Sequence, residues 1–249
     1  MTFPKLNKCE LCGRPSRLAR SHILPAFAYR SIMSAPGGFY EALRPRLKKQ
    51  GGTWAHLLCQ DCEAKLSLHE REFQKVLFPK GERPSLPITY NSSLYRCCCS
   101  ISWRVLTYLK LSEPDKYTEE SPISVMLSGQ IPEEYHSITE SVRLKWAETA
   151  LTGKSQDKDH HLIFLNGKNV PFERSDIIGF SLFKDEKNLA IASILGPMIV
   201  LGFIKNGSGW QNTTIEPNGS TFTISTQSLP VGFFRWLHDL YFNIERVAH

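Results

Sequence analysis

Residues 9–25 read CELCGRPSRLARSHILP, and residues 59–63 read CQDCE. Each stretch holds two cysteines separated by two residues, and such a pair can bind one metal ion through both of its thiolates. Two pairs together supply the four sulfurs of a tetrahedral zinc site. The spacing therefore predicts a structural zinc ion in an N-terminal module, with the ligands Cys9, Cys12, Cys59 and Cys62.

The whole chain has the composition of a globular protein. Its 249 residues are 41% hydrophobic and 22% charged, and that length holds one large domain or two modest ones. The start lacks the apolar run of a signal peptide, and glycine and proline interrupt the longest apolar stretch, 191–204, so we expect no membrane partner. An odd count of seven cysteines favours metal binding in a reducing, cytoplasmic compartment over disulfides.

The pattern along the chain predicts an α+β fold in two parts. Residues 1–78 are expected to form the zinc module, residues 79–93 a linker rich in proline, and residues 94–249 a mixed α+β domain. Periodicity predicts helices over 61–78, 94–111, 133–151 and 230–247, and strands over 161–165, 177–183, 189–195 and 198–204. A flexible basic loop is expected over 36–52, and a hairpin over 213–226 that turns at 217–219.

Positive charge is concentrated in the module. The first 60 residues carry ten Lys or Arg and two Glu, a net charge of +8, and the rest of the chain sums to −2. A basic module on a near-neutral body is typical of a nucleic-acid-binding protein, although a solvated basic surface gives the same pattern. We expect these side chains to contact phosphates rather than to read bases. The predicted nucleic-acid contacts are Arg14, Arg17, Arg20, Arg44, Arg46, Lys48 and Lys49.

Three segments of the module, CELCG at 9–13, SHILP at 21–25 and LLCQDCE at 57–63, resemble the HNH (ββα-metal) nucleases of the treble-clef zinc group. The resemblance covers about a quarter of the chain. It implies a treble-clef fold for the module and a metal-dependent endonuclease that hydrolyses phosphodiester bonds, in DNA rather than RNA. The group includes restriction, mobile-element and antiphage enzymes, so the resemblance also implies a defence or toxin role.

The resemblance assigns roles to individual residues. His22 takes the place of the general base that activates water, and the ordinary pKa of histidine suits that role. In that group an acid precedes this histidine and helps to bind a catalytic divalent ion, a histidine commonly follows the last cysteine, and an asparagine comes before the second pair. Here Ser21, Glu63 and Trp54 stand at those positions. Glu63, with Glu70 two turns further along the same helix, offers oxygen ligands for Mg or Mn.

Several of these residues also have a structural interpretation. Glu63 complements the positive end of a helix dipole, and Glu70 suits a solvated face beside Lys or Arg. Other chemically active side chains are expected to be structural throughout: His56 at the surface, His69 packed on the core, His160 and His161 as an exposed pair, and Cys97, Cys98 and Cys99 in the core.

Two functions therefore remain open at this point. The first is an HNH-type endonuclease in which His22, Glu63 and Glu70 are catalytic and Ser21 helps to hold the ion. The second is a non-catalytic zinc module that recognises nucleic acid or a protein, and the absence of an acid at position 21 supports it. In either case the C-terminal domain is available to bind a protein partner or to position the substrate. A weaker third interpretation makes that domain the active part, with the zinc module docking it.

Overall fold

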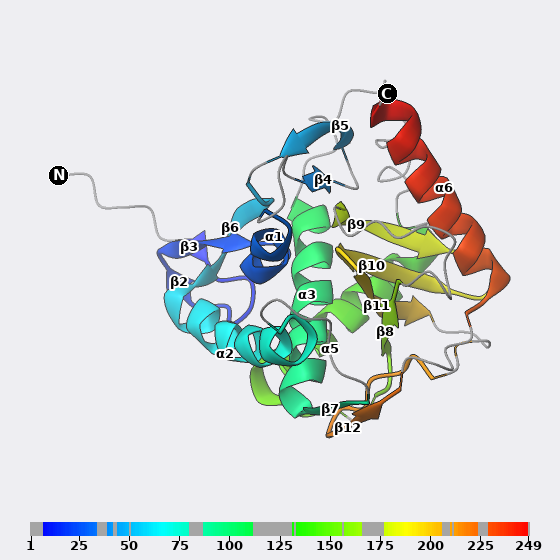
Figure 1. Cartoon of the computed structure of the whole chain (residues 1–249). Coiled ribbons are helices and arrows are strands. Elements are labelled where there is room, and N and C mark those ends of the chain that lie inside the picture. Colours follow the sequence, from blue (N-terminus) through cyan, green and yellow to red (C-terminus); the bar gives the residue numbers. More distant parts are fainter. Residues whose placement is uncertain are drawn as a thin grey trace.

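Strands from both ends of the chain form one six-stranded sheet in the computed structural model (Figure 1). The strand order is β5-β4-β9-β10-β11-β8, and neighbours are antiparallel except β4 and β9, which are parallel. The strands are β4 Phe39–Glu41, β5 Arg44–Lys49, β8 His160–Phe164, β9 Ile177–Lys184, β10 Leu189–Leu195 and β11 Met198–Lys205. The structure describes residues 7–33, 39–41, 44–49, 51–79, 87–111, 131, 133–155, 157–165, 177–205, 210, 212–223 and 229–248.

Helices cover both faces of the sheet, which explains why its central strands are apolar throughout. One face packs against α3 (Ser92–Leu111) and α5 (His136–Thr152), which follows a 3₁₀ turn at Glu133–Tyr135. The other face packs against α6 (Val231–Ala248), at the right in Figure 1. Side chains alternate along β10, so Ile191 joins the α3 layer while its neighbour Ala192 joins the α6 layer. The predicted helices and strands of this region are confirmed to within a few residues.

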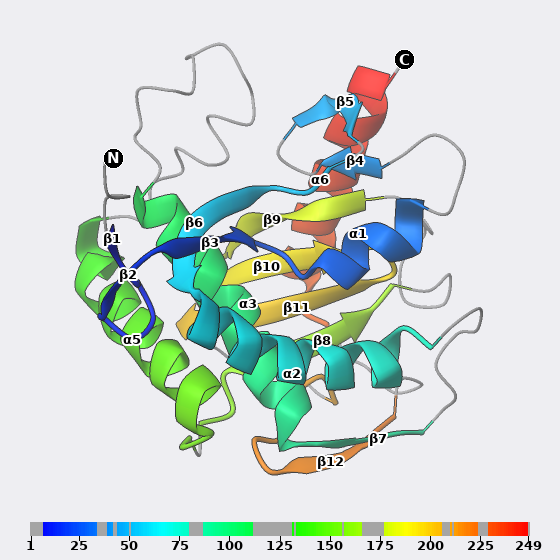
Figure 2. The ribbon, with the colours of Figure 1, turned by 90° about the vertical axis from the view of Figure 1, so that its left-hand side faces the viewer.

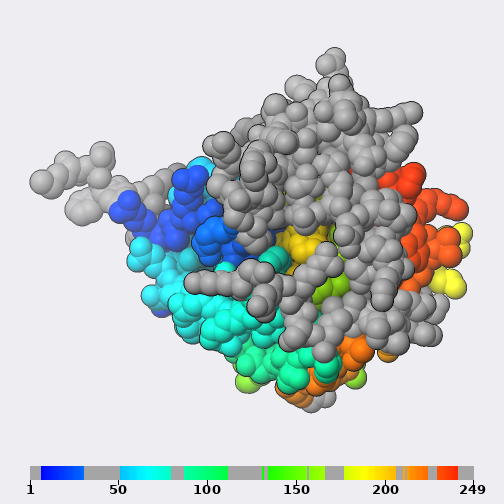
Figure 3. All heavy atoms as spheres, viewed as in Figure 1, coloured from blue at the N-terminus to red at the C-terminus, as the bar shows by residue number. Residues whose placement is uncertain are grey.

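The N-terminal module packs against α3 on the side of the molecule opposite α6 (Figures 1 and 3). Its strands β3 (Leu18–His22) and β6 (Trp54–Cys59) pair antiparallel, and α2 (Gln60–Leu77) follows β6 directly. Two further strands, β1 (Asn7–Lys8) and β2 (Pro15–Ser16), form a small hairpin, and α1 spans Ala26–Met33. Figure 2 shows β3 beside β6 and α2 lying across α3.

A single buried cluster contains apolar residues from both predicted parts of the chain. Leu66 and Phe73 on α2 belong to it together with Trp103 on α3 and Val200 on β11, and all four are fully buried. Cys97, Cys98 and Cys99 are also fully buried in this cluster, which confirms their expected place in the core. The division into two domains stays a prediction.

The expectation that His160 and His161 are exposed is wrong, because both side chains of this β8 pair are buried. His160 Nδ1 lies 2.8 Å from Asp159 Oδ1 and its Nε2 lies 3.1 Å from Ser102 Oγ. Trp146 Nε1 donates to Asp159 Oδ2 over 2.9 Å. Ser102 and His160 are both fully buried, so this serine, histidine and aspartate set holds α3, α5 and β8 together rather than facing a substrate.

Three local predictions also need correction. The expected basic loop contains β4 and β5, and β5, with the sequence RPRLKK, forms the edge of the large sheet. The expected linker contains β7 (Ile88–Asn91), which pairs with β12 (Gly219–Phe222). The turn before Gly219 does form, with φ +89° at that residue, but its two arms pair elsewhere, since Thr214 bridges His161. None of the helices in the described ranges is long and apolar enough to span a membrane.

Candidate metal centre and adjoining polar cluster

The four predicted zinc ligands converge. Cys9 and Cys12 lie in the turn between β1 and β2, Cys59 ends β6, and Cys62 lies in the first turn of α2. Their Sγ atoms all lie within 4.8 Å of one another, and Cys12 Sγ is 3.8 Å from Cys59 Sγ. A tetrahedral ion with Zn–S bonds of about 2.3 Å places its sulfurs about 3.8 Å apart. The four cysteines could therefore hold a metal ion such as zinc.

Local backbone geometry explains how the first pair is presented. Gly13 has φ +75°, a conformation that costs glycine little, and its N–H donates to the Cys9 carbonyl over 2.8 Å. This bond closes the turn and directs both sulfurs to one side. The Cys59 N–H also donates to Cys9 Sγ over 3.3 Å, which ties the turn to the start of α2.

The pKa values of the clustered cysteines are shifted in opposite directions. Burial raises the pKa of Cys9 and, together with hydrogen bonds to neighbouring thiols, the pKa of Cys62. For Cys12 burial is outweighed by donors from Arg14, which bring its pKa down to about 6. All seven cysteines are free thiols. A dication bound to all four sulfurs would stabilise each of them as a thiolate.

Next to the cysteines, the structure brings the three predicted catalytic residues together. His22 is the last residue of β3, and Glu63 and Glu70 on α2 are close enough to act on the charge of its imidazole. Ser21 is fully buried and donates its hydroxyl to Glu63 Oε2 over 2.7 Å. His22 and Ser21 thus leave β3 on opposite faces, as neighbours in a strand do.

An arginine that the sequence analysis did not select links these groups. Arg104 lies on α3, and its side chain is 1% exposed. Its Nη1 donates to Glu70 Oε1 over 2.6 Å and to the His22 carbonyl oxygen over 3.3 Å. Its Nη2 lies 3.9 Å from Glu63 Oε2. One guanidinium therefore contacts the end of β3 and two acids of α2, Glu63 and Glu70.

His22 itself is half-buried and has a pKa below the ordinary histidine value. Burial is the main cause, and the positive charges of Arg20 and Arg104 lower this pKa further, while Glu63 and Glu70 act against them. Its ring lies 5.8 Å from the ring of Tyr29. A lowered pKa keeps the imidazole neutral near pH 7, the form that can accept a proton.

The two carboxylates do not fit a divalent ion as they are placed. Arg104 already neutralises Glu70 and lies close to Glu63, and its positive charge would repel a dication held between them. Ser21 directs its hydroxyl to Glu63 rather than offering it to an ion. Within the part of the chain that the structure describes, the only His, Cys, Asp or Glu cluster converging closely enough for a metal is the four cysteines. The predicted Mg or Mn ion therefore has no support at Ser21 and Glu63.

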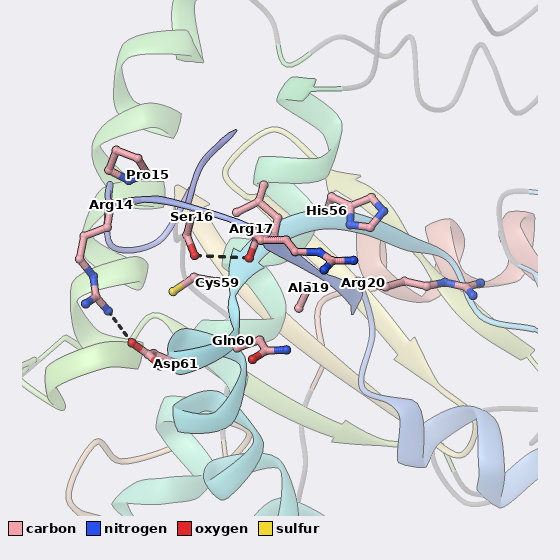
Figure 4. A pocket seen from close by; sticks show the side chains of 11 residues that line it. Arg14, Pro15, Ser16, Arg17, Ala19, Arg20, His56, Cys59, Gln60 and Asp61 are labelled. Carbon is pink, nitrogen blue, oxygen red and sulfur yellow. Dashed lines mark hydrogen bonds and ion pairs between the residues drawn. The ribbon is translucent and has the colours of Figure 1, made fainter. Parts of the chain in front are cut away.

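The predicted basic residues divide into two groups. Arg14, Arg17 and Arg20 line a groove of about 870 Å³ together with His56 and the start of α2. Figure 4 shows Arg14 extending to Asp61, with which it forms an exposed 3.0 Å ion pair, while Arg17 and Arg20 extend away from it. The second group, Arg44, Arg46, Lys48 and Lys49, belongs to β5 at the edge of the large sheet, and the structure describes only its backbone.

Two residues of this region were missed as functional candidates. Arg104 gave a signal, because it is a charged residue inside the apolar helical run 94–111. Trp54 was noted only as a departure from the family pattern, yet 42% of it is exposed. The contacts of both residues depend on the tertiary fold, which the sequence pattern does not supply.

Comparisons of the chain with models of protein families, with curated proteins and with solved structures found no match.

Proposed function

We propose that the chain is a phosphodiester hydrolase that acts on nucleic acid, with DNA preferred to RNA, and that His22 is its general base. The observation that carries the proposal is that Arg104 contacts the backbone carbonyl of His22 and the carboxylates of Glu70 and Glu63. Glu63 directly follows Cys62 of the cysteine cluster in sequence. The sequence motifs predict this chemistry for the same three residues, His22, Glu63 and Glu70. The HNH resemblance and the treble-clef interpretation belong to the same proposal.

The proposed step uses groups of this chain. Neutral His22 accepts a proton from a water molecule while the water oxygen attacks phosphorus, and the bond from phosphorus to the leaving oxygen breaks. Solvent water protonates the leaving oxygen, so the products are a phosphate monoester and an alcohol. In this proposal Arg17 and Arg20 contact the non-bridging oxygens. Arg104 holds the carbonyl of His22 and thereby positions the base.

The cysteine-bound ion has a structural role in this proposal. Zinc would fix the turn between β1 and β2 against the start of α2, and β3 leads from that turn to His22. Arg104 supplies the positive charge near the two acids, so we assign Glu63 and Glu70 to positioning through Arg104 and derive no step through Mg or Mn. Cleavage with Mg, with Mn and with EDTA tests whether such an ion is required.

The test is cleavage of supercoiled plasmid and of an end-labelled oligonucleotide by the full chain, with Mg, with Mn and with EDTA. We expect His22→Ala to lower the cleavage rate about 100-fold or more, the usual loss for a general base, with unchanged zinc content. The matched control is His238→Ala, an exposed histidine on α6, which should cleave like the wild type. Equal cleavage by wild type and His22→Ala would overturn the assignment.

A second function is favoured by one specific observation, the pairing of both acids with Arg104 and of Ser21 with Glu63. Satisfied carboxylates suit a non-catalytic module that only recognises nucleic acid or a protein. Wild type that binds DNA but leaves both substrates intact under all three metal conditions would support this function instead.

A further inference from the structure

Trp54 is exposed on the same face of the module as His22. The two residues are directly opposite each other in the register of β3 and β6, and side chains of an antiparallel pair leave the sheet on the same side. Trp54 is 42% exposed, whereas Trp103 and Trp146 are fully buried and Trp210 is nearly so. An exposed tryptophan beside the proposed base is not needed for packing.

Charged and polar groups already surround this ring. The guanidinium carbon of Arg20 lies 3.8 Å from the centre of the Trp54 ring, a cation–π arrangement. His56 lies two residues further along β6 and places its ring edge-on, with the ring centres 5.6 Å apart. Arg20 and His56 also line the groove that continues to Arg17 and Arg14. A flat stacking surface therefore leads directly into a basic groove.

These features match the requirements of a single strand of DNA. Single-strand-binding proteins combine a positively charged groove for the backbone with aromatic or arginine surfaces on which unpaired bases stack. In a duplex the faces of each base are covered by its neighbours, so an exposed tryptophan finds no partner there. The +8 charge of the first 60 residues complements the phosphate backbone.

We propose that the outer face of β3 and β6 binds single-stranded DNA, with one base stacked on the Trp54–Arg20 pair and the adjoining phosphates along Arg17 and Arg14. This proposal rests on the proposed function and specifies its substrate. The register of Trp54 opposite His22 places the phosphodiester next to the stacked base within reach of the imidazole. Unpaired DNA, rather than duplex, is then the substrate.

The test is a fluorescence titration with a 12-nucleotide single strand and, separately, with the same sequence as a duplex. We expect the single strand to quench tryptophan emission of the wild type and to bind more tightly than the duplex. Trp54→Leu should lose most of the quenching and bind the single strand about 10-fold to 100-fold more weakly, the usual cost of losing one stacked base. Trp54→Phe should retain most of the affinity, because it keeps an aromatic face.

Trp236→Phe, which changes the half-buried tryptophan of α6, is the matched control and should leave both quenching and affinity unchanged. The proposal is overturned if Trp54→Leu binds the single strand like the wild type, if it weakens single strand and duplex equally, or if the wild type binds neither. Its failure is separable from that of the proposed function. If neither the wild type nor His22→Ala cleaves DNA but both bind the single strand tightly, this inference stands and the hydrolase proposal is rejected.

Discussion

Arg104 on α3 donates a 2.6 Å hydrogen bond to Glu70 on α2, and this ion pair joins the N-terminal module to the helix that packs on the large sheet. The same guanidinium contacts the carbonyl of His22. The position of the proposed base therefore depends on a residue more than 80 positions away in sequence. Stability of the core and geometry of the site are coupled through this side chain.

Removing this arginine should be costly. We expect Arg104→Met to lower the free energy of unfolding by about 3–5 kcal/mol, because it leaves two acids without their buried partner. Lys110→Met is the matched control, since Lys110 forms an exposed pair with Glu140 at 3.1 Å and such pairs contribute about 1 kcal/mol or less. Urea denaturation measures both. Equal losses in the two variants would show that burial of the Arg104 pair adds nothing.

Zinc should be present at one ion per chain and should depend on the four clustered cysteines. Cys59→Ser removes one thiolate ligand, so we expect the ion to be lost and trypsin to cleave faster after Arg17 and Arg20, which precede Leu18 and Ser21. Cys98→Ala, which changes a buried cysteine outside the cluster, should keep the ion. Elemental analysis and timed proteolysis provide the readouts. Full zinc occupancy in Cys59→Ser would contradict the predicted ligand set.

Acid should destabilise the fold through a buried histidine. Burial, with a smaller contribution from His160, lowers the pKa of His161 to about 3. In the unfolded chain the imidazole of His161 takes up a proton near pH 6.5, whereas the folded protein keeps it neutral until about pH 3. The free energy of unfolding is therefore unaffected by His161 above pH 6.5 and decreases as the pH falls from 6.5 toward 3. The expected slope is about 1.4 kcal/mol per pH unit for one such group.

The measurement is the free energy of unfolding between pH 6 and pH 4.5, a range above the ordinary pKa values of Asp and Glu. His161→Gln keeps a partner for Thr213, whose Oγ1 lies 2.7 Å from the imidazole Nδ1, but cannot titrate. The free energy of unfolding of His161→Gln should fall with decreasing pH less steeply than that of the wild type, by about 1.4 kcal/mol per pH unit. Parallel curves for the two proteins would refute the assignment.

Two glycines offer a matched test of packing. A Cβ added at Gly202 on β11 would lie 2.4 Å from Ser102 Oγ and 2.9 Å from a ring carbon of Trp146, so we expect Gly202→Ala to cost about 1–3 kcal/mol. A Cβ at Gly51 meets nothing within 4 Å, and Gly51→Ala should change stability by about 0.5 kcal/mol or less. Thermal denaturation of both variants checks this difference.

Much of the fold follows from local patterns in the sequence. The apolar runs of β9, β10 and β11 and the periodicity of α2 and α6 are strong because helices bury both faces of the sheet and each helix buries one of its own. The sequence does not predict β4 and β5, because β5 (RPRLKK) is basic and glycine pairs at 37–38 and 51–52 bound the segment that holds both strands. The pairing of β4 with β9 also depends on residues far along the chain. Gly219 signalled a turn correctly, but a turn does not determine which strands its arms join.

The candidate site divides in a similar way. Spacing alone predicts that the four cysteines form one cluster, because two Cys-x-x-Cys pairs in one chain are typical of a metal site. His22, Glu63 and Glu70 were selected by resemblance and by helix periodicity, and they do lie together. Arg104 was out of reach, since no local pattern indicates which acids a buried arginine contacts. The buried set of His160, Asp159 and Ser102 was missed for the same reason.

The parallel pairing of β4 with β9 limits how this protein can be divided. Tyr40 and Glu41 lie opposite Ile177 and Ile178 and cover the backbone of β9 on that side. A fragment that starts after residue 79 would present β9 as an open edge with apolar side chains on both faces. Such an edge recruits strands from other molecules, so we expect that fragment to self-associate, and recombinant work should use the intact polypeptide.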